Sequence, residues 1–114
     1  MSTREIPAAN WAAFCDHVNR TQRDFAATLE VQSPDIGAQV EARNLPFDGI
    51  AADVKDARLS ISVTLRAGTT GLLTHTVTAP LRLTAESSDE GLVEALLIEA
   101  ANGLRTLVRL TSPR

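Results

Sequence analysis

The sequence predicts an α+β fold, with an N-terminal helix packed on a strongly twisted antiparallel meander of about seven to eight short strands. The apolar residues follow a helical spacing up to residue 20 and alternate with polar residues from residue 25 onward. Clusters of turn-forming residues divide the alternating part into short runs. Asn102-Gly103 lies between two apolar runs, which is the strongest short-range signal of a β-hairpin. The pattern leaves open whether the sheet curls into a partly open barrel.

The helix is predicted over about residues 8–20. Pro7 suits the first turn of a helix, where its missing N–H costs nothing. One apolar stripe recurs at positions i, i+3, i+4 and i+7 and consists of Trp11, Phe14, Cys15 and Val18. We expect this stripe to cover a second apolar face of the sheet.

Alternation predicts about eight strands in the remainder of the chain. They are residues 25–32, 38–44, 50–55, 59–66, 72–78, 81–86, 92–101 and 104–110. Turn chemistry separates them, for example at residues 33–37 and 45–49, where Pro and Gly stand near Asp. In the second of these strands, Val40 and Ala42 are predicted to point into the core.

The last two strands are predicted to pair through a two-residue turn at Asn102-Gly103. This register places Leu97 opposite Val108 and Ile98 opposite Leu107, so both faces of the hairpin carry large apolar side chains. Such a hairpin belongs at the centre of a sheet that is covered on both faces. A helix over 92–101 is the alternative, but the run that follows alternates as a strand and needs a partner.

Length and composition describe a globular protein of 114 residues, which we predict to be one domain spanning 1–114. No apolar run approaches the roughly 18 residues of a membrane span, so no membrane association is expected. The N-terminus lacks the apolar core of a signal peptide, and a single cysteine cannot form an internal disulfide. We therefore predict a cytoplasmic location.

Several kinds of partner are poorly supported by the composition. Acidic residues number 14 against 11 basic ones, the arginines are scattered, and there are four aromatic residues, so no nucleic-acid partner is expected. The two histidines and one cysteine stand in no metal-binding motif, and no nucleotide-binding or nucleophile motif is present. We therefore expect no metal, no cofactor and no catalytic residue, although the sequence leaves the question of enzymatic activity open.

Short phrases along the chain resemble a family of short, uncharacterised bacterial proteins known as a domain of unknown function. They include Arg4–Pro7 with Trp11 and Phe14, Pro34–Gly37, Gln39–Arg43, Leu45-Pro46, Gly49-Ile50, Ala52-Asp53, Lys55-Asp56, Leu73–Thr76 and Ser112-Pro113. The likeness spans nearly the whole chain. It implies a free-standing bacterial domain and supplies no activity, cofactor or catalytic residue.

Three residues are candidates for ligand binding: His75, Glu41 and Arg43. His75 shares a strand face with Leu73 and Val77, so it either bonds a carbonyl or hydroxyl at the edge of the core or lines an apolar cavity. Glu41 and Arg43 lie two apart on one strand face, where they either pair with each other, form a polar patch or belong to an ordinary solvated face, which we favour.

Cys15 lies on the apolar helix stripe, where a thiol behaves as a small inert hydrophobe. His17 points to a different side of the helix, because residues two apart are rotated by roughly 200°. A Cys15–His17 catalytic pair is therefore disfavoured.

The sequence does not establish a function. We favour a non-catalytic cytoplasmic module that binds another protein, or a second copy of itself, through a face or edge of its sheet. The alternative is a small-ligand-binding domain or a modest acid–base enzyme with His75 at an apolar cavity.

Overall fold

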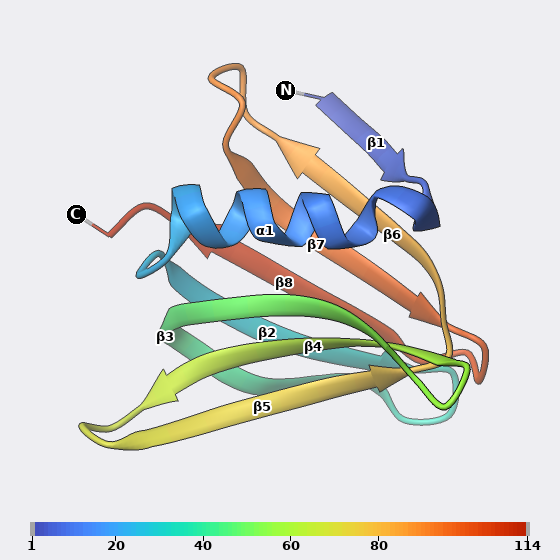
Figure 1. Ribbon diagram of the computed structural model, residues 1–114. Helices are drawn as coiled ribbons and strands as arrows, with labels where there is room; N and C mark the ends of the chain where they lie inside the picture. The colour runs from blue at the N-terminus through green and yellow to red at the C-terminus, as the bar shows by residue number, and fades with distance from the viewer. Residues whose placement is uncertain (1, 114) are drawn as a thin grey trace.

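The computed structural model describes residues 2–113, in which eight antiparallel strands form one curved sheet with a single α-helix across its concave side (Figure 1). The elements are β1 (Ser2–Ile6), a 3-10 turn at Ala8–Asn10, α1 (Trp11–Gln22), β2 (Ala26–Ser33), β3 (Gly37–Lys55), β4 (Arg58–Ala67), β5 (Gly71–Thr78), β6 (Pro80–Ser87), β7 (Val93–Ala100) and β8 (Arg105–Thr111). The order across the sheet is β1-β6-β7-β8-β2-β3-β4-β5. The α+β prediction is confirmed, and the sheet does not close into a barrel.

The sheet consists of two meanders rather than one. Strands β2 to β5 form the first and β6 to β8 the second, and they join where β2 pairs with β8. Only Ala79 connects β5 to β6, although these strands lie far apart in the sheet order. Strand β1 pairs with β6 at one end of the sheet and was not predicted from the sequence.

The predicted turn at 45–49 is wrong, because β3 runs through it. Its first part pairs with β2 as far as Pro46, and its second part pairs with β4 from Phe47 onward. Asn44 has φ of 54°, a conformation that asparagine tolerates, and it lies at a register shift in the β2–β3 pairing, three residues before β3 begins to pair with β4. The turn-forming residues therefore bend one long strand instead of ending two short ones.

The side-chain alternation in β3 also differs from the prediction. Ala42 is buried as expected, but Val40 is 43 % exposed. Leu29 pairs with Ala42 and Glu30 pairs with Val40, which leaves Glu41 without an opposite residue. This bulge reverses the alternation at Val40, because one extra residue exchanges the two faces of a strand.

Residues 92–110 form the predicted hairpin, so the helical alternative for 92–101 is wrong. Its register is shifted by one residue, because the loop has three residues: the Ala100 N–H bonds the Leu104 carbonyl at 2.9 Å, and Gly103 has φ of 89°. Leu97 therefore faces Leu107 and not Val108.

The shifted register changes which face of the sheet each side chain occupies. Val108 and Ile98 are buried on the concave face, whereas Leu97 and Leu107 are half-buried on the outer face. Helix α1 packs on the concave side as well, so the expectation that it covers a second apolar face is wrong. The outer face is less apolar than predicted, because charged residues flank the leucine pair in the next row, where Glu99 faces Arg105.

One hydrophobic core lies between α1 and the concave face of the sheet. The predicted helix stripe enters it, and its four residues, Trp11, Phe14, Cys15 and Val18, are 8 % exposed or less. The helix extends to Gln22, slightly beyond the predicted end. No helix within residues 2–113 has the length and apolar character needed to span a membrane.

Two amide side chains attach α1 to strands on either side of it. The Asn19 amide donates to the Ile50 carbonyl at 2.9 Å and accepts from the Ile50 N–H at 2.8 Å on β3. The Gln22 amide forms the same pair of bonds with Val93 on β7, at 2.7 and 2.9 Å, and is 1 % exposed. Each amide thus takes the place of a neighbouring strand for one residue of the sheet.

Candidate functional site

His75 reaches from β5 across the concave face to β8. Its Nε2 lies 3.2 Å from the Thr106 hydroxyl, which is buried. Burial lowers the pKa of His75, and the negative charge of Glu41 opposes this in part. The imidazole is therefore largely uncharged at neutral pH. The hydroxyl contact fits the core-edge alternative, while a ligand contact at His75 stays a prediction.

Glu41 lies within electrostatic range of His75, whereas within residues 2–113 Arg43 does not contribute to the pKa shift of His75. Glu41 and Arg43 are both exposed on β3, and within residues 2–113 they form no ion pair with each other. None of the four surface hollows described for this part of the chain is lined by either residue or by His75. The binding role of these residues therefore stays a prediction.

Cys15 is buried, and burial, with smaller contributions from Asp16 and Asp53, raises the pKa of its thiol to about 11. The thiol is therefore protonated at neutral pH, whereas His17 is exposed. Across residues 2–113, no three His, Cys, Asp or Glu side chains gather as a metal ion would require.

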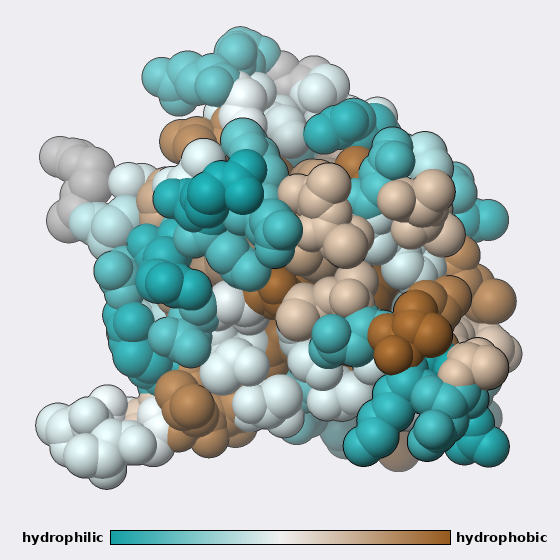
Figure 2. Space-filling model, viewed as in Figure 1, coloured by the Kyte–Doolittle hydropathy of each residue, from teal (hydrophilic) through white to brown (hydrophobic). Residues whose placement is uncertain are grey.

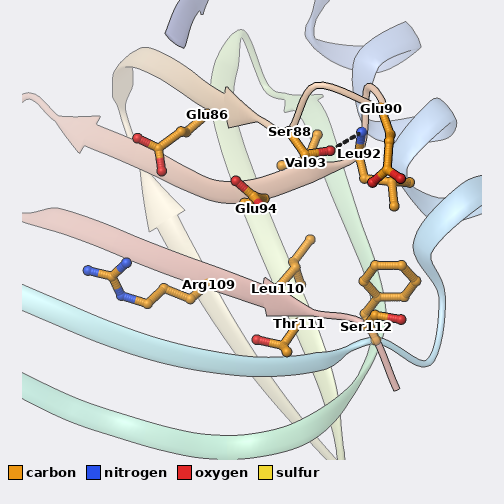
Figure 3. A pocket seen from close by; sticks show the side chains of 11 residues that line it. Glu86, Ser88, Glu90, Leu92, Val93, Glu94, Arg109, Leu110, Thr111 and Ser112 are labelled. Carbon is orange, nitrogen blue, oxygen red and sulfur yellow. Dashed lines mark hydrogen bonds between the residues drawn. The ribbon is translucent and has the colours of Figure 1, made fainter. Parts of the chain in front are cut away.

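One hollow of about 440 Å³ lies beside β7 and β8 (Figure 3). The carboxylates of Glu86, Glu90 and Glu94 and the guanidinium of Arg109 border it, with Leu110 on its wall. The Ser88 hydroxyl is engaged locally, since it accepts a bond from the Leu92 N–H at 3.2 Å. This arrangement is typical of a solvated acidic rim, and its charge alone does not identify a ligand.

The edge of the sheet at β5 presents unpaired backbone groups. The Ala79 N–H bonds the Leu59 carbonyl at 3.3 Å, so every second pair along β4 and β5 from this point is a hydrogen-bonded pair, including Val63 with His75. The pairs between them bring side chains together instead: the hydroxyls of Ser62 and Thr76 lie 3.0 Å apart.

The backbone N–H and C=O groups of alternate β5 residues therefore point away from β4. The four residues concerned are Leu72, Thr74, Thr76 and Thr78. Within residues 2–113, β5 pairs with β4 alone, so these groups have no strand partner at the end of the sheet. The Asn19–Ile50 bonds agree with this pattern, since they direct the Ile50 backbone away from β4 as well.

The β5 edge carries no charged side chain and no proline between Gly71 and Thr78. Its outer side is a row of threonines whose hydroxyls meet those of β4, with Thr64 and Thr74 at 3.2 Å. Leu72 stands at the beginning of this row and is 64 % exposed. A long, uncharged edge of this kind is ready to pair with another strand.

An apolar hollow of about 910 Å³ adjoins the other end of β5. Thr76 and Thr78 line it together with Leu59 and Leu81, which are 41 % and 68 % exposed, and the charged residues Lys55, Asp56 and Arg58 also border it. Figure 2 shows hydrophobic residues on the right of the molecule, above a hydrophilic group at the lower right, where β3 turns into β4. We define the β5 edge and this hollow together as the candidate site.

Sequence reasoning did not find this site. The uncharged run Leu72–Thr78 was visible as a strand, but a strand at the end of a sheet is indistinguishable by alternation from one inside it. Ala79-Pro80, where β5 ends and β6 begins, forms the corner beside the hollow.

Comparison with known proteins gives a family and no activity. The model of a family of unknown function, DUF5335, matches residues 2–114. A relative from Aquifex aeolicus (strain VF5), described as an uncharacterized protein, is 27 % identical over 110 residues, which cover 96 % of this chain and 93 % of the relative. No solved structure matches the chain. The resemblance of the sequence phrases to a bacterial domain of unknown function is confirmed.

Proposed function

The chain belongs to DUF5335, a family of unknown function, and we propose its function from the geometry of its own sheet. We propose that it is a non-catalytic module that binds an extended protein segment along the β5 edge. The observation that carries the proposal is the unpaired backbone of Leu72, Thr74, Thr76 and Thr78 at the end of the sheet. An added strand satisfies these groups with main-chain hydrogen bonds, which supply affinity with little dependence on sequence.

The apolar hollow supplies a way to select among segments. In strand addition, alternate side chains of the added segment point to one face of the sheet, where a pocket receives them. The hollow lies on the side of Thr76 and Thr78 and offers Leu59 and Leu81 to an apolar side chain. We therefore expect the bound segment to be extended and uncharged along β5, with an apolar residue near Thr78.

The experiment is a selection from a displayed library of random peptides against the wild-type protein, with Thr76→Pro and Thr76→Val as matched variants. The Thr76 N–H faces outward, so proline removes an edge donor without breaking the β4–β5 ladder. Valine removes the Ser62 contact and keeps the donor. We expect the selected peptides to lose about tenfold or more in affinity for Thr76→Pro and to bind Thr76→Val as they bind wild type.

Chemical-shift mapping of a selected peptide gives the second readout. The proposal predicts the largest amide shifts at Leu72, Thr74, Thr76 and Thr78. Peptides that shift the outer face at Leu97 and Leu107 instead, and bind Thr76→Pro unchanged, contradict it.

We also propose that the module acts in the cytoplasm. The single cysteine supports this, because it provides no internal disulfide for an oxidising compartment.

A further inference from the structure

We infer that the segment bound along β5 is β5 of a second copy of this chain, paired antiparallel about a two-fold axis with Leu72 of each copy seated in the apolar hollow of the other. The inference rests on the proposed function and names the partner of that same site. It is carried by two features at opposite ends of one strand, an exposed apolar side chain and a hollow whose surface is mainly apolar despite the charged residues Lys55, Asp56 and Arg58 at its border.

The backbone pattern selects the register. The outward-facing residues are the even-numbered ones, so they must pair with one another across the new interface. Pairing Leu72 with Thr78 and Thr74 with Thr76 of the second copy uses all four residues on both sides. It makes about eight main-chain hydrogen bonds, and a slip of two residues in either direction loses about two of them.

The same register brings the two apolar features together. Leu72 lies on the same face of β5 as Thr78, because residues six apart on a strand share a face. Thr78 borders the hollow that contains Leu59 and Leu81. Placing Leu72 of the second copy opposite Thr78 therefore puts its side chain at the mouth of this hollow, and the two-fold axis repeats the contact at the other end.

The charges of the edge permit this symmetry. A two-fold interface brings each residue near its own copy or a close neighbour, so a charge on β5 would meet a like charge. β5 has none between Gly71 and Thr78 except the titratable His75. His75 of both copies lies at the axis on the concave side, where the imidazoles are largely uncharged at neutral pH because burial outweighs the influence of Glu41.

The interface is a strand pair with one apolar contact at each end, which places it among the smaller specific interfaces. We expect a monomer–dimer equilibrium in the micromolar range rather than a permanent dimer. Sedimentation velocity from about 1 µM to 1 mM covers this range.

The decisive variants are Leu72→Ser and Thr76→Pro, with Ile36→Ser and Thr76→Val as controls. Ile36 is 69 % exposed in the β2–β3 turn, so it matches Leu72 in chemistry and exposure but lies away from β5. We expect Leu72→Ser and Thr76→Pro to raise the dimer dissociation constant at least tenfold and both controls to leave it unchanged. A wild-type protein that is monomeric throughout, or a dimer insensitive to both decisive variants, overturns the inference.

The register has its own test. In the proposed dimer, residue 75 faces residue 75 of the other copy as a non-hydrogen-bonded pair, where Cβ atoms lie close enough for a disulfide. In a Cys15→Ala background, His75→Cys is expected to form a covalent dimer on mild oxidation, and Val77→Cys is not. Efficient cross-linking through Val77→Cys overturns this register.

The peptide selection separates the two proposals. A strictly monomeric protein whose selected peptides bind along β5 overturns the second copy as partner and preserves the proposed function. Peptides that bind elsewhere, together with a dimer that persists in Thr76→Pro, overturn both.

Discussion

The two edge strands of the sheet, β1 and β5, differ in how their exposed backbones are protected against pairing with another strand. β1 has five residues and carries Arg4 and Glu5. Glu5 approaches Arg82 of the neighbouring strand at 3.5 Å, and the Arg4 guanidinium lies 6.0 Å from the centre of the Phe14 ring. β5 has eight residues and no formal charge apart from a largely neutral histidine.

Short length and charged side chains are the devices by which natural sheets prevent unwanted pairing. β1 uses both, and β5 uses neither. The difference teaches that an edge has to be judged strand by strand, because protection at one end of this sheet leaves the other end available. It also explains why the proposed interaction belongs to β5.

The largest expected effect concerns the two side-chain amides that attach α1 to strands in the two halves of the sheet. Gln22→Ala leaves the Val93 N–H and C=O buried without their partners, so we expect a loss of about 3 kcal/mol in the free energy of unfolding. Asn19→Ala acts at a partly buried site and should cost about 1–2 kcal/mol. Urea denaturation measures both, and equal losses would show that burial does not set the cost.

The next effect tests the assignment of inward and outward N–H groups on β5. His75→Pro removes a bond of the β4–β5 ladder and should cost about 2–3 kcal/mol more than His75→Ala. Thr76→Pro removes an outward N–H and should cost less than about 1 kcal/mol relative to Thr76→Val. Thermal denaturation of the four variants measures both stability differences. If proline costs more stability at Thr76 than at His75, the backbone groups assigned here as outward-facing point toward β4 instead.

A smaller effect appears on acidification. The pKa of His75 is lower in the folded protein than in the unfolded chain, so the unfolded chain binds more protons as the pH falls. The contribution of neutral His75 to stability is fully present above the unfolded pKa, near pH 6.5, and declines below it. His75→Gln should flatten this part of the stability curve between pH 7.5 and about pH 5, and an unchanged slope would show that other groups dominate.

The smallest effect on stability comes from exchanging the character of the two edges. Glu5→Thr removes an exposed ion pair and should change stability by less than about 1 kcal/mol, as should Thr76→Lys on β5. The effects on association should differ between the two edges. Thr76→Lys is expected to suppress pairing through β5, whereas the double variant Arg4→Thr/Glu5→Thr is expected to gain association through β1. Light scattering of the variants at one concentration compares them directly.

The elements that depend on neighbouring residues were predictable from the sequence. The stripe Trp11, Phe14, Cys15 and Val18 identifies the helix and its buried side, and Asn102-Gly103 locates a hairpin. The register of that hairpin was not predictable, because a two-residue turn and a three-residue loop both place a residue like Gly103 at positive φ.

Features that depend on contacts between distant residues could not be predicted from the sequence. The partner of Gln22 is 71 positions away, so its amide gives no local signal. Nothing in Leu72–Thr78 indicates its place at the end of the sheet, because the strand order follows from the pairing of β2 with β8. The candidate residues His75 and Glu41 lie within electrostatic range of each other, a relation that spacing alone did not reveal.

The position of α1 explains why this sheet has terminal strands at all. An eight-stranded sheet is large enough to close on itself, and a closed barrel has no terminal strands. Figure 1 shows α1 lying between the arm that contains β1 and β6 and the arm that contains β3 to β5. Its bonds to Ile50 and Val93 fix it there as a wedge. A short amphipathic helix thereby keeps the sheet from closing into a cylinder and leaves β5 as a terminal strand, the strand to which we propose that a partner adds.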